Sequence, residues 1–341
     1  MVDGTRPKVL IVKIGAIGDV IMASAMVPAI NEIFENPQVT WIVGSSAAEI
    51  VRAIDGVDRV IEIDDVALLR GNIFSRLRVI FGVWREILLR RYQIIVVAHS
   101  DRRYGLLTFG ALSRKRRALY FGGRAQPIPG RWFPCEYVRL ITGREGPLVP
   151  LAKFPKIRSC HSDMTRFAAD GVAYVVIAPG GARNVMRESP VRRWPLANYL
   201  EITGHLLRDG YRVCIVGATS DRDLLESFKK FDVIDLCGRT SLCELVTVIG
   251  GAKAVLTHDS MPLHMSLLVG TPVVGIFGPT LPIVFARAPG DVNHLRTLWG
   301  GLELSCSPCY DGRDFAVCED NVCMKNVTVS LALEALRKIC K

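Results

Sequence analysis

Short apolar runs that alternate with helical patterns limit the folds open to this chain more than any other feature. Each run is about as long as one strand, and helical spacing marks the intervening segments, such as Val20–Phe34, Leu196–Asp209 and Asp221–Lys230. Strands that are apolar on both faces are typical of parallel sheets covered by helices on each side. The sequence therefore predicts an α/β fold with doubly wound parallel sheets. The predicted strands are Val9–Lys13, Val39–Gly44, Arg59–Ile63, Ile94–His99, Tyr174–Pro179, Arg212–Gly217, Ile234–Leu236, Ala254–Leu256 and Val273–Phe277.

A break in this pattern predicts two domains. The chain has 341 residues, which is enough for two cores of ordinary size. Gly146–Arg158 holds three prolines, and the β-rich pattern begins again at Tyr174. We expect a boundary near residue 165, with Rossmann-like domains in residues 1–165 and 166–341 and a cleft between them.

Positive charge is concentrated in the first half of the chain. Residues 1–165 hold 24 Lys and Arg against 15 Asp and Glu, whereas residues 166–341 hold 19 against 18. This excess favours an anionic partner: nucleic acid, a membrane surface or an anionic substrate. No apolar run reaches the ~18–20 residues of a membrane span, and the N-terminus reads as a strand rather than a signal peptide. We expect a cytoplasmic protein.

The segment Ile73–Leu89 has apolar side chains at three- and four-residue spacing, flanked by arginines. Such a basic amphipathic helix can lie on an anionic membrane. The alternative, which we favour, is a surface helix packed on its own domain. Arg102 and Arg103 lie nearby in the sequence and enlarge the basic surface.

Polar residues follow two of the predicted strands in the second half. Thr257–Ser260 come after one strand, and Gly278-Pro279-Thr280 come after the next. Ligands of open parallel sheets bind at the carboxyl ends of strands, and Ser260 is a good N-cap for a helix whose N–H groups can bind an anion. The stretch predicts a site for a phosphorylated ligand. Because the carboxylate of Asp259 would repel phosphate, we expect it to hold sugar hydroxyls.

Two further loops follow predicted strands. Gly15-Ala16-Ile17-Gly18-Asp19 lacks the third glycine of a dinucleotide fingerprint, which disfavours a nicotinamide oxidoreductase. Asp19 is either a helix-start carboxylate or a general base, with equal weight from the loop alone. Gly180 lies in the second loop, and Arg192 after it can meet a diphosphate or be a solvated charge. Asp221-Arg222-Asp223 starts a helix, so we interpret it as capping rather than metal binding.

Four cysteines, Cys306, Cys309, Cys318 and Cys323, lie within 18 positions. Four thiolates at such spacing suit tetrahedral zinc or iron, and four free thiols in a loop are the equal alternative. The other cysteines in apolar contexts, Cys214, Cys237 and Cys243, are predicted core residues.

The motifs together resemble glycosyltransferase family 9. They are Gly18-Asp19-Val20, Pro179-Gly180, Arg192-Arg193-Trp194-Pro195, His258-Asp259-Ser260 with His264, and residues 275–280, in the family's order. The resemblance covers residues 8–340. The family includes the heptosyltransferases of the lipopolysaccharide inner core, and relatives that act on other acceptors. It implies a GT-B fold, with the acceptor on the first domain and a nucleotide-sugar on the second.

The resemblance also implies roles for individual residues. Asp19 is expected to be the general base, and Arg192 takes the place of a family lysine. The acceptor side would include Gly15, Gly18, Arg102 and Arg103; the donor site would include Gly180, Arg192, Asp259, Ser260, His264, Gly278, Pro279 and Thr280. Related heptosyltransferases that modify proteins carry iron at a comparable cysteine cluster, which supports a structural metal here.

The expected activity is therefore inverting transfer of a heptose from ADP-heptose to an anionic lipopolysaccharide inner-core acceptor. A nucleoside diphosphate is a good leaving group, so one base suffices and no catalytic cofactor is expected. We expect a location at the inner face of the cytoplasmic membrane and no nucleic-acid partner. The alternatives are another nucleotide-sugar, a protein or other glycan acceptor, and a non-catalytic nucleotide-sugar-binding protein.

Overall fold

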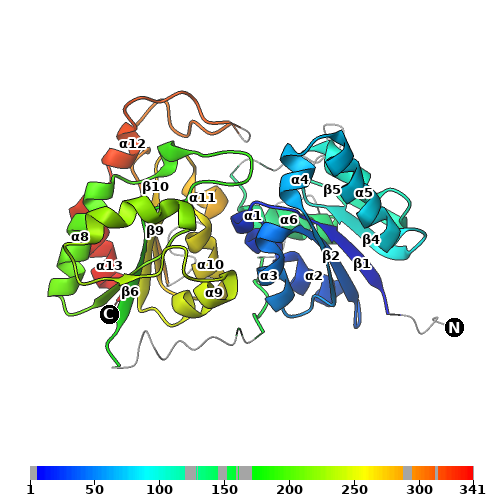
Figure 1. Ribbon diagram of the computed structural model, residues 1–341, viewed down its shortest axis with the longest axis horizontal. Coiled ribbons are helices and arrows are strands. Elements are labelled where there is room, and N and C mark those ends of the chain that lie inside the picture. The colour runs from blue at the N-terminus through cyan, green and yellow to red at the C-terminus, as the bar shows by residue number, and fades with distance from the viewer. Residues whose placement is uncertain are drawn as a thin grey trace. The chain divides into compact units, whose positions relative to one another are not determined.

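The computed structural model describes residues 6–119, 128, 130–144, 152–158, 160, 171–286, 294–311 and 314–340. The chain divides into two compact units. Unit 1 is Met1–Ser159 with Asn184–Met186, and unit 2 is Cys160–Arg183 with Arg187–Lys341. Each unit contains one parallel sheet with helices on both faces, which confirms the predicted fold class (Figure 1).

Unit 1 is built on a sheet of five parallel strands in the order β3-β2-β1-β4-β5. The strands are β1 (Lys8–Val12), β2 (Gln38–Gly44), β3 (Arg59–Ile63), β4 (Arg91–Val97) and β5 (Leu112–Ala118). The helices are α1 (Ile17–Ala23), α2 (Met26–Ile33), α3 (Ser45–Ala53), α4 (Asp65–Arg70), α5 (Ile73–Ile87), η1 (Arg102–Thr108) and α6 (Phe133–Thr142). This order is that of a Rossmann fold without its last strand, so ligands are expected at the carboxyl ends of β1 and β4.

The predicted helix Val20–Phe34 is two helices, α1 and α2, which corrects the sequence interpretation. The hydroxyl of Ser24 donates to the carbonyl oxygen of Ile21 at 2.6 Å and competes with the helical backbone. Pro28, in the first turn of α2, has no N–H to continue the ladder. The chain therefore turns between the two helices.

Unit 2 is built on a sheet of six parallel strands in the order β11-β10-β9-β6-β7-β8. The strands are β6 (Tyr174–Ala178), β7 (Arg212–Ile215), β8 (Ile234–Asp235), β9 (Ala254–His258), β10 (Val273–Phe277) and β11 (Leu295–Trp299). The helices are η2 (Pro190–Arg192), α8 (Leu196–Arg208), η3 (Thr219–Phe228), α9 (Leu242–Gly250), α10 (Met261–Val269), α11 (Pro282–Phe285), α12 (Val322–Lys325) and α13 (Val329–Ile339). This is the complete Rossmann order, with its switch point between β6 and β9.

Each unit has its own hydrophobic core beneath its helices. In unit 1, residues of the central strands pack with Val83 and Ile87 of α5. In unit 2, the strands pack with Tyr199 and Ile202 of α8 and with Leu336 of α13. None of the helices that the structure describes is both long enough and apolar enough to span a membrane.

Candidate functional site

The candidate site of unit 2 lies at the switch point of its sheet. Gly180 follows β6, Asp259 and Ser260 follow β9, and Thr280 follows β10. Since β6, β9 and β10 are neighbours in the sheet, their carboxyl ends bring these residues to one edge. This is where a helix N-terminus and loop N–H groups meet ligands in Rossmann folds.

Asp259 is the centre of this cluster and is 3% exposed. Its Oδ2 accepts a hydrogen bond from the Thr280 hydroxyl at 2.8 Å and lies 3.6 Å from Nη1 of Arg192. Arg192 also donates to the Asp259 carbonyl oxygen at 3.1 Å, and Nε2 of His264 lies 3.9 Å from Oδ1. The four residues predicted for the donor site thus lie together, and these contacts use the carboxylate to hold the protein's own side chains.

Arg192 connects Asp259 to the segment that contains Cys306, Cys309, Cys318 and Cys323, which we call the cysteine-rich segment (residues 306–323). Its guanidinium lies 5.7 Å from the ring centre of Phe315, and the Phe315 ring is 4.7 Å from that of Tyr310. Nearby, Arg187 forms an ion pair with Asp314 at 2.5 Å. An arginine held over an aromatic ring and beside a carboxylate is fixed in orientation. Phe315 and Asp314 were not predicted, since they lie more than 120 positions from their partners and carry no local signal.

Ser260 occupies the N-cap position of α10, as predicted, but its side chain makes no capping hydrogen bond. Its hydroxyl lies 3.0 Å from that of Thr257 and bonds to the carbonyl oxygen of His258 at 3.3 Å. The hydroxyl is thus engaged at the end of β9. The first turn of α10 is therefore left without a side-chain cap, which favours binding of an anion there.

The loop after β6 is held by Asp221. The Gly181 N–H donates to Oδ1 of Asp221 at 3.1 Å, and the Ala218 N–H donates to Oδ2 at 2.9 Å. This confirms that Asp221 caps η3. A Cβ at Gly180 would lie 2.4 Å from Cγ of Asp221, so only glycine fits there. Arg193 donates twice to the Gly181 carbonyl oxygen, at 3.0 and 2.7 Å, and completes a rigid loop.

The loop at residues 278–280 is tied to the cysteine-rich segment. The carbonyl oxygen of Gly278 accepts from Nε1 of Trp299 at 3.0 Å and from the Ser307 hydroxyl at 2.9 Å. The Pro279 carbonyl oxygen accepts from the Cys309 N–H at 3.1 Å. A Cβ at Gly278 would lie 2.5 Å from Sδ of Met324, so this glycine is required by packing.

His258 is buried behind the cluster, with Nδ1 at 3.0 Å from the Tyr199 hydroxyl. Burial lowers the pKa of His258 to about 3, and the positive charges of Arg192 and Arg193 act in the same direction. The ring is therefore neutral at pH 7 and supports the strand end as a packed polar group.

In unit 1, Asp19 lies in the first turn of α1, with its side chain 44% exposed. Its Oδ2 forms an ion pair at 3.0 Å with Nζ of Lys13, whose side chain is only 5% exposed. Lys13 directly follows β1, and its Nζ lies 5.6 Å from the ring centre of Tyr137. The sequence analysis did not identify Lys13 as a partner of Asp19. A lysine at the end of an apolar strand was the available signal.

The other residues predicted on the acceptor side differ in placement. Gly15 has open space where a Cβ would be, and Gly18 lies in α1 beside Asp19. Arg103 is 84% exposed at its side chain and pairs with Asp101 at 2.6 Å. Arg102 belongs to η1, and its side chain lies outside what the structure describes.

The ten cysteines are free thiols. Cys323 is buried, Cys309 is half-buried, and Cys306 and Cys318 are exposed. Burial raises the pKa of Cys309 and of Cys323, and the charges of the neighbouring cysteines add to both rises. As the side chains lie, the described residues contain no group of three His, Cys, Asp or Glu that could hold a metal ion. Cys214 and Cys237 are buried, as predicted, whereas Cys243 is only half-buried.

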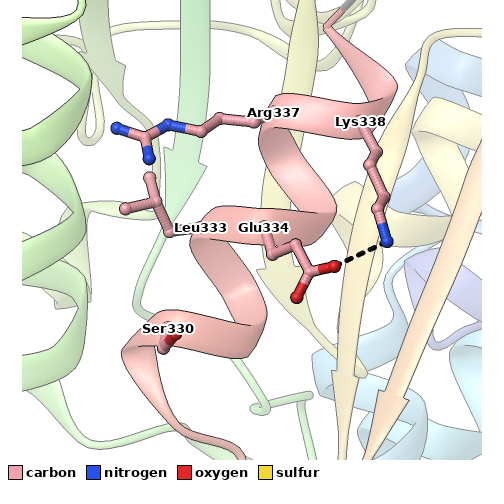
Figure 2. A pocket seen from close by; sticks show the side chains of 5 residues that line it. All are labelled: Ser330, Leu333, Glu334, Arg337 and Lys338. Carbon is pink, nitrogen blue, oxygen red and sulfur yellow. Dashed lines mark hydrogen bonds and ion pairs between the residues drawn. The ribbon is translucent and has the colours of Figure 1, made fainter.

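A hollow of about 360 Å³ lies on α13 and contains none of the predicted site residues (Figure 2). Its charged side chains are engaged within the protein: Lys338 pairs with Glu334 at 2.6 Å, and Arg337 donates twice to Asp209 at 3.0 and 3.1 Å. It therefore offers little to an anionic ligand.

Residues 153–316 match the family model of glycosyltransferase family 9 (heptosyltransferase). The match covers a little under half of the chain. The matched residues include β6, η2, α10 and the loop after β10, so they contain the cluster around Asp259.

Curated proteins that are similar to this chain carry heptosyltransferase names. Lipooligosaccharide heptosyltransferase 2 of Haemophilus influenzae is 33% identical over 33% of this chain and 35% of its own length. Lipopolysaccharide core heptosyltransferase OpsX of the same species is 22% identical over 81% of each chain. The chain thus spans about a third of the length of Lipooligosaccharide heptosyltransferase 2.

Solved structures of heptosyltransferases share their fold with nearly the whole chain. E. coli ADP-heptose lps heptosyltransferase II has a TM-score of 0.73 at 16% identity and covers 98% of both chains. The iron-containing dodecameric glycosyltransferase TibC of enterotoxigenic E. coli has a TM-score of 0.57 at 15% identity, over 98% of this chain and 76% of its own. The two Rossmann-like sheets therefore form a GT-B fold.

Proposed function

We propose that the protein is an inverting glycosyltransferase that moves a heptose from ADP-heptose to a lipopolysaccharide inner-core acceptor. The observation that carries this proposal is the cluster of Arg192, Asp259 and Thr280 at the switch point of unit 2. It supplies a fixed positive charge beside an uncapped helix N-terminus, which suits a diphosphate. The donor and acceptor are those in the names of the relatives.

The proposed step needs one base and no catalytic metal. The carboxylate of Asp19 takes the proton of the acceptor hydroxyl as its oxygen bonds to the anomeric carbon of the heptose. The bond from that carbon to the diphosphate breaks, and ADP leaves with the electron pair. Attack opposite the leaving group inverts the anomeric centre. Arg192 and the N–H groups of α10 meet the charge that develops on the diphosphate.

Asp19→Asn tests the base. The variant should lose turnover and still bind ADP-heptose with wild-type affinity, measured by calorimetry, because the substitution leaves unit 2 untouched. Asp55→Asn, at a carboxylate whose side chain is 63% exposed in unit 1, is the matched control and should keep full activity. Wild-type turnover in Asp19→Asn would remove Asp19 from the mechanism.

We place the protein in the cytoplasm, at the inner face of the cytoplasmic membrane. The relatives' lipopolysaccharide acceptors and the basic character of residues 1–165 support this location. Cell fractionation tests it: the protein should sediment with inner membranes at low salt and be released by high salt. Recovery in the soluble fraction at both salt concentrations would contradict it.

We also propose a structural metal at Cys306, Cys309, Cys318 and Cys323. The position of the four cysteines within 18 residues supports it, as does the iron of TibC. The thiols would have to move to bind an ion, since their present positions do not form a ligand set. Metal analysis of the purified protein should find about one zinc or iron per chain, and Cys318→Ser should lose it. A metal-free native protein would end the proposal.

A further inference from the structure

Helix α5 is apolar on two opposite faces. One face packs on the sheet through Val83 and Ile87, which are 1% and 0% exposed. The other carries Phe74, Leu77 and Phe81, which are 78%, 38% and 55% exposed. The helix therefore does pack on its own domain, as favoured from the sequence. A helix that only covers a sheet presents polar residues to water, so the second apolar face is unexplained.

This outer face continues onto the segments that follow α5. Leu89, Leu106 and Phe109 are 71%, 55% and 65% exposed. The Trp84 ring lies 5.1 Å from the rings of both Phe81 and Phe109, and its Nε1 donates to the Leu106 carbonyl oxygen at 2.7 Å. We call the surface formed by Phe74, Leu77, Phe81, Leu89, Leu106 and Phe109 the docking face. Its parts belong to unit 1, beside β4 and β5 (Figure 1).

Positive charge is concentrated in the part of the sequence that forms the docking face. Residues 70–117 contain twelve Lys and Arg against two Asp and Glu, a net charge of +10 that equals the net charge of the entire chain. Both acidic residues are paired with arginines, Glu86 with Arg59 and Asp101 with Arg103. Arg78 and Arg85 are exposed; Arg78 is next to Leu77 in the sequence, and Arg85 is four positions after Phe81, one helical turn away. Exposed aromatic side chains with exposed arginines on the same helix match the boundary between anionic headgroups and acyl chains.

We propose that the docking face binds the surface of an anionic phospholipid bilayer. Phe74, Phe81 and Phe109 enter the interfacial region, while the surrounding arginines meet lipid phosphates. A second copy of the chain fits less well, because two faces of the same strong positive charge repel each other. This inference extends the proposed function, which needs a lipid-linked acceptor, but its evidence is the surface itself.

Vesicle sedimentation of the full-length protein without substrates tests the proposal separately from transfer activity. The protein should bind phosphatidylglycerol vesicles and bind phosphatidylcholine vesicles far less. Raising NaCl from about 0.1 M to about 0.5 M should weaken binding, because salt screens the arginines. Phe74→Ser with Phe81→Ser should lower vesicle affinity by about tenfold or more, since each buried aromatic contributes strongly. Arg78→Ala with Arg85→Ala should lower it at low salt only.

Leu302→Ser with Leu331→Ser is the matched control, since these unit 2 side chains are 73% and 48% exposed and lie outside the docking face. The control should bind vesicles as the wild type does, and all variants should keep the wild-type melting temperature. Failure of the wild-type protein to bind anionic vesicles would overturn the inference. Equal loss in the control, or dimerisation in light scattering that Phe74→Ser abolishes, would also overturn it.

Discussion

The two carboxylates that matter most in this chain have opposite surroundings. Asp19 is nearly half-exposed and pairs with one buried cation, Lys13. Asp259 is almost fully buried among Arg192, Thr280 and His264. Its surroundings favour a positioning role, in which Asp259 fixes Arg192 for the diphosphate. That it holds sugar hydroxyls stays a prediction.

Lys13→Met tests how Asp19 is held. Without its ion pair the carboxylate can turn away from the acceptor, and misplacement of a reacting group costs about 10²-fold in the worst case. Turnover should fall at least about tenfold while the affinity for ADP-heptose is unchanged, as initial rates and calorimetry will show. Lys156→Met, at an exposed position of unit 1, is the control. Undiminished turnover in Lys13→Met would contradict the positioning role.

Thr280→Val tests the hydrogen bond to the buried Asp259 carboxylate. A hydrogen bond to a charged group contributes about 1.5–3 kcal/mol, so urea denaturation should show a loss of that size. Thr271→Val removes a buried bond to the neutral carbonyl of Ile249 and should cost only about 0.5–1.5 kcal/mol. Equal losses in the two variants would mean that Thr280 does not stabilise a charged Asp259.

His258 gives the stability of the protein a defined pH dependence. The unfolded chain binds its proton below about pH 6.5, whereas burial holds the folded pKa at about 3. The contribution of His258 to the free energy of unfolding is therefore fully present above about pH 6.5 and is lost as the pH falls toward 3. The slope is at most about 1.4 kcal/mol per pH unit for this one proton. Urea melts at several pH values should show a shallower slope for His258→Asn, and identical slopes would argue against a neutral buried ring.

At the scale of elements, the loops after β6 and β10 are positioned by close backbone approach. Gly180 lies against Asp221, and Gly278 lies against Met324 and Cys323. These contacts are enough to require glycine at both positions, even if no ligand binds there. They also fix the direction of the N–H groups in both loops.

Gly180→Ala should destabilise the protein by about 1–3 kcal/mol, because the new methyl group overlaps the Asp221 side chain. The helix cap would shift with it, and donor affinity should fall as well. Gly82→Ala is the matched control in the middle of α5, where a Cβ meets nothing within 4 Å. It should raise stability by roughly 0.5–1 kcal/mol. Thermal melts and ADP-heptose titrations measure both, and unchanged behaviour of Gly180→Ala would disprove the steric argument.

The two strands that sequence reasoning missed, β5 and β11, share one property: their residues do not show the expected apolar pattern. The strand β5 is rich in Arg and Lys because it is an edge strand, exposed over most of its length. The strand β11 is also at an edge and is only partly buried. By contrast, the buried central strands near both candidate sites were predicted within a few residues.

The residues of the candidate site also divide into those that the sequence could predict and those that it could not. Residues that follow central strands, such as Asp259 and Thr280, could be placed because the sheet brings strand ends together. Lys13 had a usable signal, a charge at the end of an apolar strand. The contacts of Arg192 with Phe315 and of Arg187 with Asp314 depend on how a distant segment folds back, which no local pattern encodes.

At the scale of the whole molecule, chemistry and charge are divided between the units. Unit 2 contains the cluster suited to a diphosphate, and residues 70–117 of unit 1 contain positive charge equal to that of the whole chain. The proposed function divides its substrates in the same way, with a lipid-linked acceptor on unit 1 and a soluble donor on unit 2.

The most direct test of the central claim is a donor panel with product detection by mass spectrometry. Wild-type protein would be incubated with an inner-core lipopolysaccharide acceptor and, in turn, ADP-heptose, other ADP-sugars and UDP-sugars. The account predicts that only ADP-heptose releases its nucleotide and yields an acceptor heavier by one heptose. NMR should show that the anomeric configuration of the transferred heptose is inverted. No transfer from ADP-heptose, or equal transfer from a UDP-sugar, would contradict it.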